Sequence, residues 1–211
     1  MQILFGFGKS KKDYEIIFKN PKAVSQLLYS DRTKTSKILG DEEFINAWLS
    51  SEIQQEVYLL IRQEAIDGDV PSLKQMVWYL DMMYQNILTI QMDDRQKFRD
   101  IVSVLGDRLF FCNQLTAKGI PQHYYAMITL HNLHKAVMQF NQPGTLELAR
   151  DNLNKMIEHA HAVIKMGKNH PAFDGDAGFI DDAQMIIREE KELRGFLNAM
   201  GDSLSKLDGK R

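Results

Sequence analysis

Two stretches decide the fold, AIDGDVPSLKQM at residues 65–76 and TAKGIPQHYYAM at residues 116–127. In each, a segment with periodic apolar residues ends, a glycine and a proline follow, and a second periodic segment begins. A glycine just after a helix can take a positive φ that satisfies the last carbonyl groups, and a proline soon afterwards cannot continue that helix. Both stretches are therefore predicted to be turns between two helices.

The segments around these turns have the spacing of one helix face. In residues 95–115, apolar side chains stand at offsets 0, 3, 4, 7, 11 and 14, namely Phe98, Ile101, Val102, Leu105, Leu109 and Cys112. The same spacing recurs in residues 53–61, 73–87, 124–131, 146–164 and 180–200. This period fits a helix and not the alternation of a strand. The sequence predicts an all-α protein.

The turns recur at regular intervals. Gly68, Gly119 and Gly167 are 51 and 48 residues apart, and each precedes a proline. Further breaks at 91–94 and 141–144 divide the chain into three antiparallel helical hairpins, 51–90, 95–140 and 145–200. A single hairpin cannot bury its apolar face alone, whereas stacked hairpins can. Stacked hairpins are the predicted architecture.

About half of the chain resembles the tetratricopeptide and SEL-like helical repeats. The matching positions are Ala65, Gly68 and Leu80 in the first unit and Ala117, Gly119, Ala126 and Leu130 in the second. Tetratricopeptide units are ~34 residues long, shorter than the hairpins here. The resemblance implies an α-solenoid whose concave groove binds peptides or proteins, and it implies no catalytic residues.

The expected domain organisation follows from these hairpins. Residues 1–40 are a short basic helical extension, 41–200 the repeat domain, and 201–211 a polar tail. Residues 168–182 are expected to form a flexible acidic loop. Expected N-caps are Asn20, Ser51 (with Gln54 in a capping box) and Thr145.

Composition restricts the class of protein. The chain has 211 residues, 44% hydrophobic and 26% charged, with a net charge of −2 and one cysteine. A disulfide within the chain is therefore excluded, and neither a signal peptide nor a membrane span of about 18 apolar residues is visible. We expect a soluble, cytoplasmic protein. Charge is uneven: residues 1–40 hold eight Lys/Arg against three Asp/Glu, and residues 41–68 hold seven acids against Arg62.

Catalytic and metal-binding patterns were each tested against the residues that the chemistry requires. His131 and His134 could share a helix face as two ligands, but no HExxH or CxxC pattern accompanies them. His131 continues the apolar face, so it is expected to be buried and hydrogen-bonded. The loop around Asp174 and Asp176 lacks the glycine and glutamate of an EF-hand. A single ExxH, Glu158 to His161, does not make a di-iron site. No metal or cofactor is predicted.

The predicted function is a non-enzymatic protein–protein interaction module. A specific version is a cytoplasmic immunity or inhibitor protein whose acidic segment binds a basic toxin or effector domain. Predicted partner-binding residues are Glu52, Gln55, Glu56, Arg62, Trp78, Tyr79, Arg99, Asp107 and Arg108. Two alternatives stay open: a metal-dependent enzyme using the histidine-bearing helices of 123–161, and a nucleic-acid-associated adaptor using the basic N-terminus.

Overall fold

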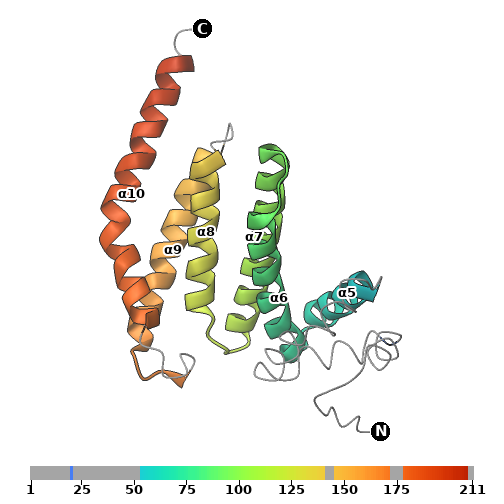
Figure 1. Cartoon of the computed structure of the whole chain (residues 1–211). Coiled ribbons are helices and arrows are strands. Elements are labelled where there is room, and N and C mark those ends of the chain that lie inside the picture. Colours follow the sequence, from blue (N-terminus) through green and yellow to red (C-terminus); the bar gives the residue numbers. More distant parts are fainter. Residues whose placement is uncertain (1–19, 21–52, 141–144, 172–177, 209–211) are drawn as a thin grey trace. The chain divides into compact units, whose positions relative to one another are not determined.

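Figure 1 shows the computed structural model of the chain, whose described regular elements are all helices. The structure describes Asn20 and residues 53–140, 145–171 and 178–208. Apart from Asn20, the predicted basic extension lies outside these residues, as do Glu52, the Ser51 cap and the break at 141–144. For the described part of the chain, the prediction of an all-α protein is confirmed.

The helices follow the predicted order of the three hairpins. They are α5 (Ile53–Ile66), α6 (Val70–Thr89), α7 (Asp94–Ala117), α8 (His123–Phe140), α9 (Leu146–Met166) and α10 (Gly178–Asp208). Helix α10 includes residues 178–182, which were expected in the acidic loop, and it continues into the expected polar tail. The chain separates between Met76 and Val77, within α6, into two compact units.

The turn after α5 is a Schellman motif. Gly68 has a φ of 92°. Its N–H donates to the carbonyl of Ala65, and the N–H of Asp69 donates to the carbonyl of Glu64, both at 3.0 Å. These are the two bonds that define the motif. Asp69 then accepts a hydrogen bond from the Ser72 N–H at 2.9 Å, which caps the first turn of α6.

The turn after α7 repeats this pattern. Gly119 has a φ of 80°. Its N–H donates to the Thr116 carbonyl, and the Ile120 N–H donates to the Leu115 carbonyl, both at 3.0 Å. The two similar sequence stretches therefore encode the same backbone motif, and the predicted role of both glycines is confirmed.

The third turn differs in conformation. Gly167 also has a positive φ, 78°, but its ψ is 161°. This is a region that glycine alone adopts readily. Its N–H donates to the Ile164 carbonyl at 3.1 Å, and its own carbonyl accepts from the His170 N–H at 3.1 Å. Glycine is thus required here as predicted, although α9 does not end in a Schellman motif.

Helix starts show one predicted cap and one that the sequence analysis missed. Thr145 is the N-cap of α9, as predicted, but its side chain makes no capping hydrogen bond. Asp93 is the N-cap of α7, and its carboxylate accepts hydrogen bonds from the N–H groups of Arg95 and Gln96 at 3.0 and 3.1 Å. The negative charge of Asp93 also lies at the positive end of the helix dipole.

Helices α7 to α10 pack side by side in chain order, each chiefly against the next (Figure 1). Short connections make consecutive helices antiparallel. The buried layer between them is almost entirely apolar, and its fully buried members include Leu105, Phe111, Leu115, Met127, Leu130, Leu153, Met156, Ala160 and Ala183. No helix in the described part of the chain is both long and apolar enough to cross a membrane.

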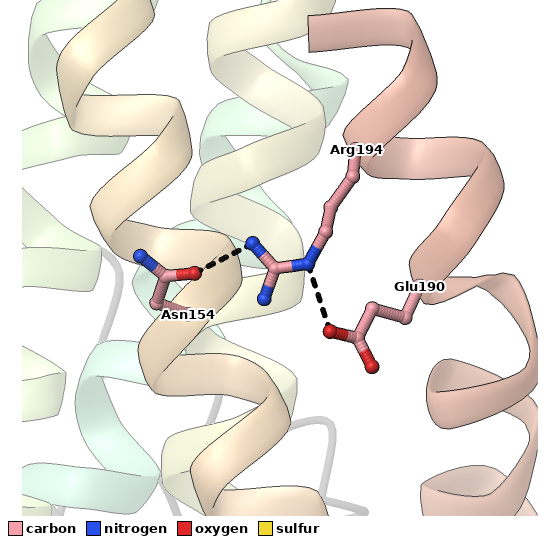
Figure 2. A network of polar contacts seen from close by, with 3 residues as sticks. All are labelled: Asn154, Glu190 and Arg194. Atoms are coloured by element: carbon pink, nitrogen blue, oxygen red, sulfur yellow. Dashed lines mark hydrogen bonds and ion pairs between the residues drawn. The ribbon is translucent and has the colours of Figure 1, made fainter. Parts of the chain in front are cut away.

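A polar network joins α9 to α10 at the surface (Figure 2). The Arg194 guanidinium donates from Nε to Glu190 Oε1 and from Nη1 to Asn154 Oδ1, both at 2.8 Å. Glu190 is one turn earlier on α10, whereas Asn154 belongs to α9. Because the contact is exposed, its main effect is to select the orientation of α10 and not to add much stability.

Candidate functional site

One side of α5 is open to solvent and carries two of the predicted partner-binding residues. Gln55 and Glu56 are both exposed there. The same side carries Leu59 and Ile66, whose exposed fractions are 54% and 49%. Seven residues separate this apolar pair, so the two side chains lie about two turns apart on one face. We call Gln55, Glu56, Leu59, Gln63 and Ile66 the α5 outer face.

The other predicted residues on α5 and α6 are less accessible. Arg62 on α5 and Trp78 and Tyr79 on α6 are half-buried, and each takes part in a further interaction. Glu52 lies outside the described residues. The structure therefore places Gln55 and Glu56, among this group, on a fully exposed face.

Helix α7 has a second exposed face. Arg99, Ser103, Gly106 and Phe110 follow one another along it, and the Phe110 side chain is 47% exposed. A Cβ added to Gly106 would meet open space, so no packing contact requires a glycine there. Of the predicted residues, Arg99 lies on this face and Asp107 is half-buried at its edge. We call Arg99, Ser103, Gly106 and Phe110 the α7 outer face.

Arg108 is not on an accessible surface, in contrast to the prediction that it binds a partner. It is 4% exposed, and its Nη1 lies 2.8 Å from Asp81 Oδ1 on α6. The contact is an ion pair and not an aligned hydrogen bond: within the described residues, Arg108 Nε and Nη1 have no hydrogen-bond partner. Helix α7 packs against α8, and its Arg108 is buried facing Asp81 of α6, whereas Leu109 is only half-buried.

The single cysteine lies beside this ion pair. Cys112 is buried one turn after Arg108. Burial raises the pKa of its thiol to about 12, with Arg108 lowering it and Asp81 raising it by smaller amounts. Since the thiolate is the nucleophilic form, burial disfavours the reactive form of Cys112 in the folded protein.

Two histidines meet where α8 and α9 pack. His123, the first residue of α8, and His159 on α9 have their Nδ1 atoms 3.0 Å apart. Their ring centroids are 5.3 Å apart with the planes inclined at 42°. Both side chains are half-buried. Burial lowers both pKa values, and His123 contributes further to lowering the pKa of His159, to about 4. At neutral pH both rings are uncharged.

The next residue of α8 contacts α10 instead. The Tyr124 hydroxyl donates to Asp182 Oδ2 at 2.8 Å. Its ring stacks on Phe179, with centroids 4.0 Å apart and an interplanar angle of 29°. His123 and Tyr124 together make the first turn of α8 a junction with both following helices.

The prediction that His131 is buried and hydrogen-bonded is wrong. The His131 side chain is half-buried, and its Nδ1 has no hydrogen-bond partner within the described residues. The buried histidine is His134, whose Nδ1 lies 3.4 Å from the Ala149 carbonyl oxygen. The pKa of His131 is lowered to about 4, chiefly by burial and also by Lys135 and His134, while Asp182 acts in the opposite direction. Because α8 packs against both α7 and α9, its buried face extends past His131 to His134.

In the residues that the structure describes, no group of three or more His, Cys, Asp or Glu side chains is arranged to hold a metal ion. The comparisons with known proteins were equally without result. No protein-family profile, curated protein or solved structure matches the chain.

Sequence reasoning considered His131 with His134 but missed His123 with His159. A signal for the second pair was present. His123 and His159 lie at equal distances on either side of position 141, in the break between the two helices. In an antiparallel hairpin such residues come to the same level. The contact of His134 with Ala149 follows the same register.

Proposed function

We propose that the chain is a non-enzymatic protein–protein interaction module whose helical hairpins stack as a repeat, and that the α5 outer face binds a basic segment of a partner protein. One observation supports this most directly: two large apolar side chains, Leu59 and Ile66, are about half exposed on a face that also carries Glu56. Exposed apolar side chains flanked by charge are typical of protein-binding surfaces.

The spacing suits a partner helix. Leu59 and Ile66 offer two apolar contacts about two turns apart, as a helix that presents apolar residues at i and i+7 requires. Burying an exposed Leu or Ile side chain completely contributes roughly 1.5–3 kcal/mol before the costs of association.

Charge adds selectivity for a basic partner. Helix α5 contains two acidic residues, Glu56 and Glu64, and one basic residue, Arg62. Asp67 comes directly after the helix. The Glu64 carboxylate already accepts a hydrogen bond from the Ser72 hydroxyl at 3.0 Å, so Glu56 is the carboxylate best placed for an incoming lysine or arginine. Opposite charges at the rim mainly accelerate association and exclude acidic partners.

The second unit contributes its own candidate contacts. These are Arg99 and Phe110 on the α7 outer face, with Asp107, Trp78 and Tyr79, and they form a contact region separate from the α5 outer face; the buried Arg108 is left out. A partner that carries a basic catalytic or membrane-active domain would be masked by such contacts. In that case the chain would act as a cytoplasmic immunity or inhibitor protein.

The test uses the full-length chain with two substitutions on the α5 outer face, Glu56→Lys and Leu59→Ser. Proteins captured from a cytoplasmic extract are identified, and a basic candidate is purified for binding kinetics at low and high salt. Glu56→Lys should slow association and weaken its salt dependence, and Leu59→Ser should speed dissociation.

Matched controls come from α10, where Glu192 and Phe196 are also exposed. Glu192→Lys and Phe196→Ser should leave the kinetics unchanged. A partner whose binding is insensitive to both α5 substitutions, or a partner that is acidic, would exclude the proposed surface.

A further inference from the structure

The Nδ1 atoms of His123 and His159 converge, and no third His, Cys, Asp or Glu joins them among the residues that the structure describes. Their separation of 3.0 Å fits a hydrogen bond in which one imidazole donates to the other. The same two nitrogens can also serve as a pair of metal ligands, because each ring can carry its remaining proton on Nε2. Metal binding would need both Nδ1 lone pairs to point at one shared ion, so the rings would turn from their hydrogen-bonded orientation.

The distance indicates which coordination geometry the pair fits. Two imidazole nitrogens at the usual bond length from one ion are about 2.9 Å apart at a right angle and about 3.3 Å apart at a tetrahedral angle. The observed 3.0 Å is close to the right-angle value. Adjacent positions at a right angle are those of a tetragonal Cu²⁺ or Ni²⁺ site, and imidazole is a preferred ligand of both ions.

We propose that His123 and His159 form a two-histidine binding site for a late first-row divalent metal ion, with Cu²⁺ and Ni²⁺ preferred over Zn²⁺. Water or a ligand from outside the chain would complete the coordination. Hard ions such as Mg²⁺ and Ca²⁺, which select oxygen ligands, would not bind there.

The surrounding packing supports a preformed site. His159 is followed directly by the buried Ala160, and the half-turn before it holds the buried Met156 and Ile157. Packing of α8 on α9 therefore fixes the level of both rings. Both side chains are half-buried, so an ion can reach the pair from solvent.

The experiment uses the full-length chain without an affinity tag, because added histidines would bind the same ions. Cu²⁺ alone is titrated by calorimetry into the unmodified chain and into His123→Gln and His159→Gln. We expect saturable binding of one Cu²⁺ ion to the unmodified chain. Either substitution should lower the affinity for Cu²⁺ at least about tenfold, because even the loss of a group that only hydrogen-bonds to a metal ligand lowers affinity by that factor. His161→Gln, which changes an exposed histidine on the same helix, is the control and should bind like the unmodified chain.

A second measurement does not depend on how the variants fold. Electron paramagnetic resonance of one equivalent of Cu²⁺ in the unmodified chain should show coupling to two imidazole nitrogens. A spectrum without such coupling, or an affinity that survives both substitutions at the pair, would overturn the proposal. The α5 outer face shares no residue with this site, so failure here leaves the proposed protein-binding function to its own test.

Discussion

The contact between α6 and α7 and the contact between α8 and α9 bury polar side chains in opposite ways. In the first, the positively charged Arg108 side chain is buried, and its Nη1 lies 2.8 Å from Asp81 Oδ1. In the second, His134 is buried and His123 and His159 are half-buried, and the pKa of each is lowered by burial. An arginine cannot give up its proton, so it needs a counter-charge, whereas a histidine can become neutral.

This difference determines how each contact can be disrupted. The α6–α7 contact depends on the Asp81 carboxylate, so substituting Asp81 should weaken it. The α8–α9 contact depends on the protonation state of its rings and responds to acid.

Asp81→Asn should destabilise the protein most. The substitution leaves the Arg108 charge buried and unpaired, for which about 3–5 kcal/mol is typical of fully buried pairs. Because the Asp81 side chain is 37% exposed, water can replace part of the lost interaction. We expect a loss of about 2–3 kcal/mol in the free energy of unfolding, measured with urea.

The matched control is Asp151→Asn, whose carboxylate pairs with Lys155 at 2.7 Å on the surface of α9. Its effect should stay within about 0.5 kcal/mol. Equal effects of the two substitutions would show that the Arg108 charge is solvated and would remove the contrast between the contacts.

Acid should selectively weaken the helices from α8 onward. The pKa of His131 is about 4 in the folded protein, below its ordinary value of 6.5, so the unfolded chain binds more protons between these values. Stability is therefore fully present above pH 6.5 and falls as the pH drops toward 4. Because His131 is half-buried, we expect a loss of about 1–2 kcal/mol, less than the full shift would give.

Urea unfolding at neutral and acidic pH measures this loss. The charged or titratable groups facing His131 are Lys135, His134 and Asp182. His131→Leu should flatten the pH dependence, and His161→Gln, at an exposed position, should leave it unchanged. A slope that is the same in all three proteins would assign the acid sensitivity to other groups.

Tyr124→Phe should have the smallest effect. The substitution removes the hydroxyl that donates to Asp182 at 2.8 Å but keeps the ring stacked on Phe179. A loss of about 1 kcal/mol is typical for such a bond, equivalent to about 2–4 °C in Tm for a chain of this size. Tyr125→Phe on the same turn serves as the comparison, and a larger effect there would place the α8–α10 junction at Tyr125 instead.

The helices and their turns could be predicted because their causes are local. Gly68 and Gly119 each follow an apolar-periodic segment, and both adopt the positive φ that a Schellman motif requires. Thr145 was identified as an N-cap from a few neighbouring residues. Spacing and capping act within one or two turns, so a single sequence contains them.

The interior polar residues could not be predicted in the same way. Whether position 108 faces solvent depends on how far the buried face of α7 extends between two neighbouring helices. The pairing of His123 with His159 joins residues 36 positions apart and depends on the register of the α8–α9 hairpin. Exposed Leu59 and Ile66 belonged to the predicted helix, but their accessibility depends on which sides of α5 the rest of the fold covers.

Cys112 gives the chain an internal reporter. It is the single thiol of the sequence, it is buried, and its pKa is raised to about 12. The folded protein is therefore nearly inert to alkylating reagents, and the thiol reacts only during transient opening of α7. The rate of labelling then reports, without any engineered probe, how often the region around Arg108 opens locally.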